Sequence, residues 1–350
     1  MLRKHGSLVT VALIFASSLT PAQSPPPAAV PQSQTLSVGV IVQLTTPPVL
    51  FVMNQTTGVD AVDLRSGRLL WHSNHAAAPL LARGNELLTL APPLPGKTGG
   101  RLFVLDTHTG DVMAQLPDLE VKGWSVVLEQ GLRTSLELYG CVRGDRDFLV
   151  WKGETRDVSP VLHPARRGGE VARGAVEVDL ASATLAPTTE VFPDRVLAMK
   201  SDGRGGSLWE AFETGGVRVT LAKLIRHNSF IILVRRARGR DALPDAILAQ
   251  PATQFSNPEV SVDRRHVLVA YYKGKEGYDV TTFDAATGKR LRHLVTDSWP
   301  APFLIWDDLL VYYTPSVVRV VDFASGKALF GHAVRDLTYR GPYPPGASRP

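Results

Sequence analysis

The sequence predicts an all-β fold, a β-propeller built from four-stranded blades. Three observations predict it: a turn motif occurs four times, strand-like runs flank each copy, and neighbouring copies lie about one blade apart. The fullest copy spans residues 61–71, Ala-Val-Asp63-Leu-Arg-Ser-Gly67-Arg-Leu-Leu-Trp71. The other three copies are marked by Asp106 and Gly110, Asp284 and Gly288, and Asp322 and Gly326. We assign these residues a structural role in repeated turns.

The motif has the form Asp-x-x-Ser/Thr-Gly, and each fixed residue has a physical reason. The Asp carboxylate can accept hydrogen bonds from backbone N–H groups two or three residues further on, which closes a turn. Glycine adopts the positive φ that ends a type I turn in a bulge, where a side chain would clash. Runs rich in β-branched or aromatic residues precede three copies: Leu102–Leu105, Tyr278–Phe283 and Val317–Val321. The motif therefore predicts β-hairpins.

The spacing of the copies predicts the architecture. Asp63 and Asp106 are 43 residues apart, and Asp284 and Asp322 are 38 apart, whereas one propeller blade takes about 40 residues. The 178 residues between Asp106 and Asp284 divide into four steps of about 44 or five of about 36. The sequence therefore predicts seven or eight blades, each of which buries its faces against its neighbours.

Residues 61–71 resemble the tryptophan-docking motif of the quinoprotein-like (PQQ-like repeat) β-propeller family, whose pattern is Ala-x-Asp-x-x-Thr-Gly-Lys-x-x-Trp. In that family the tryptophan packs against the adjacent blade, and Trp71 matches it here. The other copies keep Asp and Gly but place different residues at or next to the tryptophan position: Ala114, Arg292 or His293, and Phe330. The resemblance covers residues 58–117 and 260–332.

The first 22 residues have the features of a secretory signal peptide. They contain a positively charged start, an apolar core at 8–16 and small residues for cleavage at 20–22. An apolar stretch of this length is too short to span a membrane comfortably. Residues 23–34 follow as a Pro-rich linker, a composition typical of extended spacers. We expect an exported protein, periplasmic or extracellular, with no membrane span after signal removal.

Residues 35–340 are expected to form the propeller as a single domain, followed by a disordered tail over 341–350. Apolar residues alternate at positions 36, 38, 40 and 42 and predict a first strand that starts at Thr35. This strand could pair with C-terminal strands and so close the ring.

The turn motif is less regular between residues 118 and 260, but the all-β prediction extends through this region. No long helical period interrupts it. Degenerate turns are expected at 153–155 and 213–216. Four runs predict strands: Phe148–Trp151, Arg195–Met199, Val217–Leu221 and Phe230–Val234.

Composition and charge fit a globular exported protein. The hydrophobic content is 44%, and the formal net charge of +5 falls to +3 when Arg3 and Lys4 leave with the signal. Such a mild charge does not indicate a nucleic-acid partner, and the basic run Arg235–Arg240 predicts a solvated loop. Cys141 is the only cysteine, so stability must come from core packing rather than an internal disulfide. We expect a monomer in which Cys141 is a buried small residue.

The sequence predicts no catalytic, cofactor or metal site. Quinone-dependent enzymes of the resembled family hold calcium through carboxylate and amide ligands and place adjacent cysteines beside the cofactor. Here Cys141 has no cysteine neighbour, so we expect neither PQQ nor calcium. His72 and His75, three residues apart, would point to opposite faces of a strand and are predicted to be surface loop residues. Asp307-Asp308 and Gly84-Asn85 predict tight turns before strands.

The leading functional interpretation is a non-catalytic binding or scaffolding propeller outside the cytoplasm. Its loops and channel mouth would present side chains to a protein or a cell-envelope component. The resemblance implies a role of this class, since the quinoprotein-like propeller subunit of the outer-membrane β-barrel assembly machinery acts as a scaffold. The alternative is an enzyme at the propeller axis, either a quinone-dependent oxidoreductase or a hydrolase. A third possibility is small-ligand binding in the axial channel.

Overall fold

The structure is a computed structural model, and it describes the greater part of the chain. The described stretches are residues 33–91, 100–119, 132–157, 170–192, 199–201, 206–209, 212–214, 217–224, 229–236, 247–248, 259–314 and 316–334. The predicted signal peptide, the linker up to residue 32, the tail at 341–350 and residues 237–240 of the basic run lie outside them. Within the described stretches, no helix is long and apolar enough to cross a membrane.

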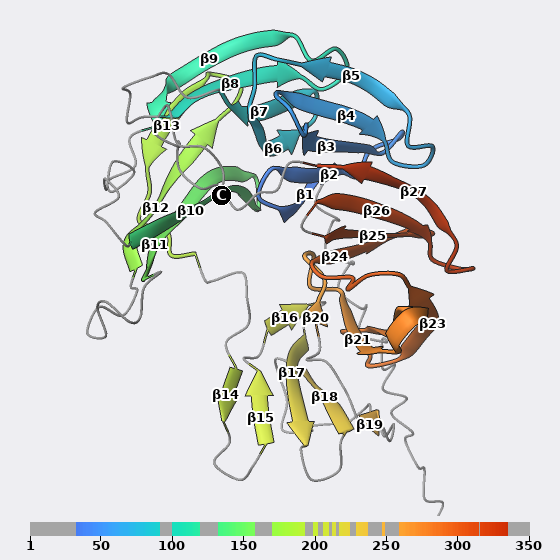
Figure 1. Cartoon of the computed structure of the whole chain (residues 1–350). Helices are drawn as coiled ribbons and strands as arrows, with labels where there is room; N and C mark the ends of the chain where they lie inside the picture. The colour runs from blue at the N-terminus through green and yellow to red at the C-terminus, as the bar shows by residue number, and fades with distance from the viewer. Residues whose placement is uncertain are drawn as a thin grey trace, which may run out of the picture.

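Six antiparallel sheets, named A to F in chain order, contain the described strands (Figure 1). Sheet A has five strands: β1 (Ser33–Ser37), β2 (Val40–Gln43), β3 (Val49–Met53), β4 (Val59–Asp63) and β5 (Leu69–Ser73). Sheet B has four: β6 (Ala78–Arg83), β7 (Glu86–Leu90), β8 (Gly100–Asp106) and β9 (Val112–Leu119). Sheet C has four: β10 (Leu132–Arg143), β11 (Arg146–Asp157), β12 (Glu170–Asp179) and β13 (Thr184–Pro187).

The remaining three sheets come from the second half of the chain. Sheet D has the order β14-β15-β17-β18-β19, with β16 also paired to β17. Its strands are β14 (Met199–Ser201), β15 (Gly206–Trp209), β16 (Phe212–Thr214), β17 (Val217–Leu224), β18 (Ser229–Arg236) and β19 (Ile247–Leu248). Sheet E has β20 (Glu259–Val260), β21 (His266–Tyr272), β22 (Tyr278–Asp284) and β23 (Arg290–Thr296), with a short 3-10 helix η2 (Gly274–Glu276). Sheet F has β24 (Phe303–Trp306), β25 (Leu309–Thr314), β26 (Val317–Asp322) and β27 (Ala328–Ala333).

Shared hydrophobic clusters order five of these sheets as neighbours. Buried residues of sheets E and F form one cluster, those of F and A a second, those of A and B a third, and those of B and C a fourth. Figure 1 shows the same sequence C, B, A, F, E along an arc, with β9, β5 and β27 on its outer side. The all-β prediction is confirmed, and face-to-face packing of successive sheets is consistent with a propeller.

The described residues form six sheets, fewer than the seven or eight blades that the average spacing predicts. Strand length explains part of the difference. In sheet C, β10 and β11 are 12 residues long and β12 is 10, about twice the usual strand length. These long strands use more residues than a uniform period of about 40 provides for, and the number of blades in the whole chain stays a prediction of seven or eight.

The run that begins near Thr35 forms two strands rather than the one predicted. A turn with Gly39 at φ +68° separates β1 from β2, and the two strands pair with each other as a hairpin. Among the described residues, β1 therefore pairs with β2 and not with a C-terminal strand. Instead, β1 adds a fifth strand to sheet A, where the Ser33 and Thr35 hydroxyls donate to the carbonyls of Ala82 in sheet B and Gly140 in sheet C.

The degenerate turn predicted at residues 153–155 is also wrong, because these residues lie inside β11. The pairing of β11 with β12 shifts register between Gly153 and Glu154, which marks a bulge or irregularity. Glycine within a long strand commonly marks a bulge, so its presence there did not signal a chain reversal. The second expected turn, at 213–216, includes residues 215 and 216, which lie outside the described stretches.

The two tight turns predicted before inner strands are confirmed, and both connect neighbouring sheets. Gln43 donates its side-chain N–H to the Gly84 carbonyl at 2.6 Å, which joins sheet A to the β6–β7 turn. Arg65 of sheet A forms ion pairs with Asp307 at 2.6 Å and Asp308 at 2.9 Å in the β24–β25 turn. These side chains are half exposed, so the ion pairs orient the loops more than they stabilise the fold.

Candidate functional site

The four predicted turns have the same hydrogen-bond pattern. In the first, Asp63 Oδ1 accepts the Ser66 backbone N–H at 2.7 Å and the Ser66 hydroxyl at 2.6 Å, and the Gly67 N–H donates to the Asp63 carbonyl at 2.9 Å. These bonds from Ser66 hold the pKa of Asp63 below its ordinary value. Asp106, Asp284 and Asp322 accept the corresponding backbone N–H groups, and the four glycines, Gly67, Gly110, Gly288 and Gly326, have φ between 69° and 76°.

Trp71 connects sheet A to the turn of sheet B. Its indole N–H donates to the Thr107 carbonyl at 2.9 Å, and its ring lies against Gly110 so closely that a Cβ there would be 2.6 Å from the ring. Phe330 of sheet F lies in the same way against Gly67, with 2.7 Å to a Cβ at that position. Gly67 and Gly110 therefore provide contact surfaces for an aromatic residue of a neighbouring sheet, from sheet F onto A and from sheet A onto B.

A fifth copy of the turn joins β12 to β13 and was not found in the sequence. Asp179 Oδ1 accepts the Ser182 N–H at 3.1 Å, and hydrogen bonds from Ser182 lower the pKa of Asp179. The glycine position holds Ala183, whose φ of +53° is left-handed. The motif Asp-x-x-Ser/Thr-Gly contains glycine at this position, so the alanine conceals the repeat in the sequence.

Replacing Ala183 by glycine is expected to raise the free energy of unfolding by up to about 1.6 kcal/mol. An L-residue in the left-handed region costs roughly 1–2 kcal/mol, and the extra freedom of glycine in the unfolded chain cancels about 0.4–1 kcal/mol of the gain. Urea unfolding of the two proteins measures the difference. Ala186→Gly, in the adjacent strand β13, is the control and should destabilise; a destabilising Ala183→Gly would contradict the turn assignment.

The opposite end of sheet A carries a group of polar side chains. Since β4 runs antiparallel to its neighbours, the β3–β4 turn and the motif turn after β4 lie at opposite ends of the strand. Asp60, the second residue of β4, is at the β3–β4 end, and its side chain is only 5% exposed. This end is not occupied by the structural turns and is the candidate functional site.

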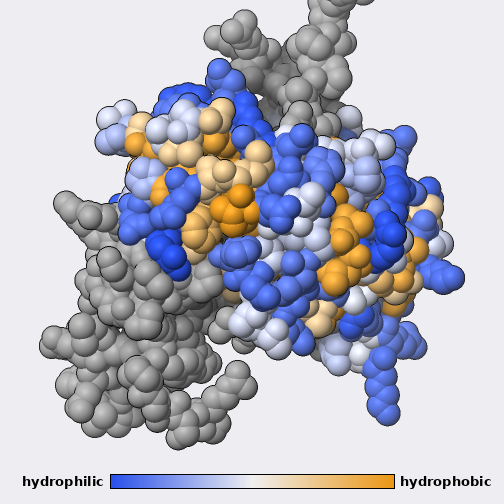
Figure 2. Space-filling view, turned by 90° about the horizontal axis from the view of Figure 1, so that it is seen from above, coloured by the Kyte–Doolittle hydropathy of each residue, from blue (hydrophilic) through white to orange (hydrophobic). Residues whose placement is uncertain are grey.

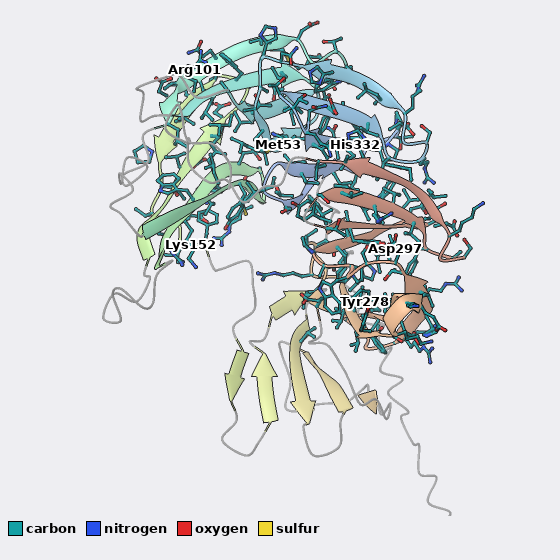
Figure 3. The ribbon with its side chains drawn as sticks, viewed as in Figure 1. Met53, Arg101, Lys152, Tyr278, Asp297 and His332 are labelled. Atoms are coloured by element: carbon teal, nitrogen blue, oxygen red, sulfur yellow. The ribbon has the colours of Figure 1, made fainter. Side chains whose placement is uncertain are left out.

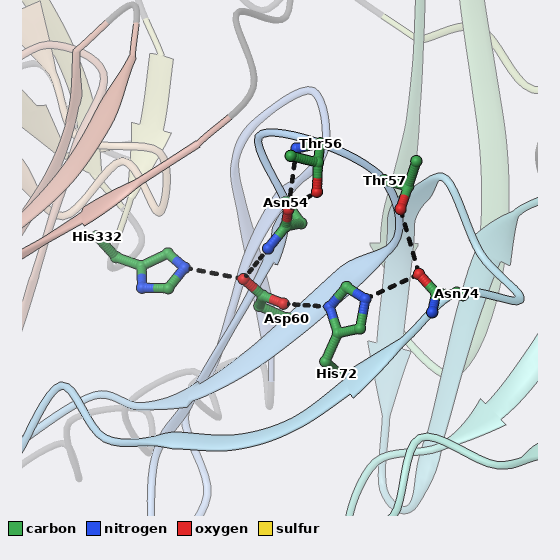
Figure 4. Close-up of polar contacts among 7 residues, drawn as sticks. All are labelled: Asn54, Thr56, Thr57, Asp60, His72, Asn74 and His332. Atoms are coloured by element: carbon green, nitrogen blue, oxygen red, sulfur yellow. Dashed lines mark hydrogen bonds and ion pairs between the residues drawn. The ribbon is translucent and has the colours of Figure 1, made fainter.

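Both carboxylate oxygens of Asp60 form hydrogen bonds with neighbouring side chains (Figure 4). Oδ1 lies 2.6 Å from Nδ1 of His72 on β5, and Oδ2 accepts the Asn54 amide N–H at 2.8 Å. His332, on β27 of sheet F, places its Nε2 3.2 Å from Oδ2. His72 Nε2 is 2.9 Å from Asn74 Oδ1. Figure 3 shows His332 where sheet F adjoins sheet A, so the group connects the two sheets.

The partners of Asp60 determine its charge. Burial alone would raise the pKa of Asp60, but hydrogen bonds from His332, His72 and Asn54 together outweigh it, and the pKa is lowered. The Asp60 carboxylate raises the pKa of His72, with a further contribution from Asn74. The group therefore contains a buried carboxylate beside an imidazole that tends to hold a proton.

Sheet E repeats this arrangement. Asp279 is the second residue of β22, its side chain is 4% exposed, and it forms ion pairs with Lys273 at 3.0 Å and with His293. Gly58 and Gly277, two residues before each aspartate, have φ of +86° and +88°. The sequences Asn54-x-x-x-Gly-x-Asp60 and Lys273-x-x-x-Gly-x-Asp279 share one spacing. This second repeat was the signal available in the sequence for the buried aspartates.

Two sequence predictions about single residues need correction. His72 lies on strand β5 rather than in a loop, and it binds Asp60; His75 is exposed. A spacing rule for metal ligands could not reveal a partner twelve positions earlier on the neighbouring strand. Cys141 is half-buried rather than fully buried, beside the cluster that contains Tyr139 and Phe148.

No metal centre is formed by the described residues, since no group of three or more His, Cys, Asp or Glu side chains among them is placed to hold an ion. Asp60, His72 and His332 use their facing atoms to bind one another. The described arrangement can therefore store a proton and join two sheets, and it presents half-exposed imidazole and amide groups to solvent.

A second surface feature lies on the outer strands. Of the eight exposed large hydrophobic residues in the described stretches, five lie at the beginning of an outermost strand: Leu69 and Leu70 on β5, Val112 and Met113 on β9, and Leu329 on β27. We name these five residues the apolar rim. Figure 2, which views the side of the molecule that carries β5 and β9, shows apolar areas between hydrophilic ones. The three strands belong to the consecutive sheets F, A and B.

Comparisons with known proteins give structural likeness only. No protein-family model matches the chain, and no curated protein matches it. An uncharacterized protein from Listeria monocytogenes EGD-e is similar with a TM-score of 0.41 and 9% identity, covering 90% of this chain and 94% of the other. Apo AztD from Citrobacter koseri gives 0.35 and 13%, covering 82% and 94%. A europium-containing methanol dehydrogenase gives 0.27 and 13%, covering 84% and 68%.

Proposed function

We propose that this protein is an exported, non-catalytic binding or scaffolding propeller of the quinoprotein-like type, and that its apolar rim binds a protein partner. The observation that carries the proposal is the concentration of exposed apolar residues at equivalent positions of three neighbouring outer strands. Scattered surface hydrophobic residues are ordinary, whereas a recurrent group on adjacent elements is typical of an interaction surface.

The chemistry of the apolar rim favours a protein over an envelope polymer. Leu69, Leu70, Val112, Met113 and Leu329 are between 37% and 55% exposed. Aliphatic and Met side chains gain affinity by removing apolar surface from water, and the core of a protein interface supplies such surface. A hydrated glycan strand offers hydroxyl groups instead, which these side chains cannot satisfy.

The order of the sheets supports a continuous contact surface. Phe330 follows Leu329 and lies against Gly67 in sheet A, and Trp71 follows Leu70 and lies against Gly110 in sheet B. Leu70 and Leu329 are thus each adjacent in sequence to a side chain that fixes one sheet to the next. The apolar rim is therefore held on a rigid base, which lowers the entropic cost of binding.

Co-purification from an envelope extract of the source organism tests the proposal. The full chain is expected to enrich one defined protein. The double variant Leu70→Asp/Met113→Asp is expected to reduce this enrichment at least about tenfold, since the few residues that dominate an interface are each worth about 2 kcal/mol or more and about 1.4 kcal/mol is tenfold. Val295→Asp is the matched control, because Val295 is an exposed apolar residue on β23, an outer strand outside the apolar rim. Unchanged enrichment by the double variant would overturn the proposal, as would recovery of glycan alone.

A further inference from the structure

We propose that Asp60, His72 and His332 form a proton-dependent clasp that joins sheet F, the last sheet of the described chain, to sheet A, the first. Asp60 and His72 are opposite each other on paired strands of sheet A. His332 comes from β27, 272 positions away in the sequence, and its Nε2 lies 3.2 Å from the same carboxylate. The clasp thus crosses the boundary where the beginning and the end of the described chain meet.

The geometry of His72 favours a protonated imidazole. Its Nδ1 faces a carboxylate oxygen of Asp60 at 2.6 Å, and its Nε2 faces the amide oxygen of Asn74 at 2.9 Å. Both partners are acceptors, and neutral imidazole has only one N–H. The Asn74 oxygen also accepts the Thr57 hydroxyl at 3.2 Å. With the Asn74 oxygen turned toward the ring, only the imidazolium form satisfies both contacts.

Proton loss from His72 weakens the junction through Asp60. The imidazolium charge compensates a carboxylate whose side chain is 5% exposed, and a buried charge without compensation is costly. The titratable groups that face one another here are Asp60 of β4, His72 of β5 and His332 of β27, while Asn54 and Asn74 contribute uncharged amides. When His72 becomes neutral, the carboxylate that His332 binds loses its paired charge.

The direction of the pH effect follows from the two shifted groups. The pKa of His72 is raised above its ordinary 6.5, so its contribution is fully present below pH 6.5 and is lost as pH rises through the raised pKa. The pKa of Asp60 is lowered below its ordinary 3.8, so its contribution is present above pH 3.8 and is lost as pH falls through the lowered pKa. Both contributions, and so the whole clasp, are fully present between pH 3.8 and pH 6.5.

Nuclear magnetic resonance of the full chain with labelled histidines tests the clasp directly. At pH 6, both ring nitrogens of His72 are expected to carry protons, and the midpoint of its titration is expected above 6.5. In Asp60→Asn this midpoint should return toward 6.5 or below. A wild-type His72 that titrates at or below 6.5, or that carries one proton at pH 6, would overturn the proposal without any variant.

Hydrogen exchange shows which strand loses protection when the clasp loses its proton. Between pH 6 and pH 9, after correction for intrinsic base catalysis, protection of the β27 amides is expected to fall by about tenfold or more, in line with the loss of a hydrogen bond to a charged group. Protection in β9, the outer strand of sheet B, should not change. His332→Ala should reduce β27 protection at both pH values, whereas the control His75→Ala should leave it unchanged. Equal responses of β27 and β9 would contradict the clasp.

Discussion

Replacing Trp71 by alanine is expected to lower the free energy of unfolding by about 3–5 kcal/mol, the range for truncating a buried Trp or Phe. Trp71 is 9% exposed, and the centroid of its ring lies 5.8 Å from the centroid of the Phe51 ring in the same sheet. Its N–H also satisfies the Thr107 carbonyl of sheet B, which loses that donor in the variant. Urea unfolding, monitored by fluorescence and circular dichroism, measures the change.

A double-mutant cycle with Gly110 distinguishes the specific contact between the Trp71 ring and the Gly110 turn from a general loss of apolar contact. Gly110→Ala places a methyl group 2.6 Å from the Trp71 ring at φ +76°, which combines left-handed strain of about 1–2 kcal/mol with overpacking of about 1–3 kcal/mol. In the Trp71→Ala background, Gly110→Ala should cost only the backbone strain. The stability loss of the double variant should therefore be smaller than the sum of the losses of the two single variants.

Gly84→Ala is the matched control for this cycle. Gly84 also has a positive φ, +56°, but a Cβ there would meet no atom within 4 Å. Its cost should therefore be backbone strain alone and should be the same with or without Trp71. If Gly110→Ala and Gly84→Ala cost the same in the natural background, the ring does not depend on the glycine, and the docking interpretation is wrong.

Local chemistry explains which parts of the fold were predictable from the sequence. The Asp63 carboxylate closes its turn within three residues, and the turn needs Gly67 because the backbone there has a positive φ. Both features depend on residues that are close together in the sequence, so the sequence alone reveals the turn. Strands such as β8 and β22 were predicted for the same reason, since their β-branched, aromatic and aliphatic residues lie close together in the sequence. Ala183 shows the limit of such patterns: the backbone adopts the glycine conformation without glycine.

The candidate site was not predictable because its partners meet only in the folded chain. Asp60 and His332 are 272 positions apart, and they approach because sheets A and F share a hydrophobic cluster. Nothing near His332 in the sequence distinguishes it from His293, which binds a different aspartate in its own sheet. The repeat that places Asp60 and Asp279 is visible in the sequence, but its meaning depends on knowing that both aspartates are buried.

Leu36→Ala is expected to lower the free energy of unfolding by about 2–5 kcal/mol, the range for a buried leucine. Leu36 is 1% exposed and belongs to the cluster that joins sheets A and F. Urea unfolding measures the change. Gln34→Ala is the control, because Gln34 is half-buried on the same strand, and substitutions at such sites usually change stability by about 0.5 kcal/mol or less.

The position of β1 gives this prediction a functional consequence. Its Ser33 and Thr35 hydroxyls reach carbonyls of sheets B and C, while Leu36 packs between A and F. One short strand of sheet A thus also contacts sheets B, C and F. The two hydroxyl contacts do not involve Leu36, so they remain when its side chain is truncated. Leu36→Ala should therefore destabilise the protein without exposing a new small-molecule site, and ligand binding gained by this variant in a thermal-shift screen would contradict the argument.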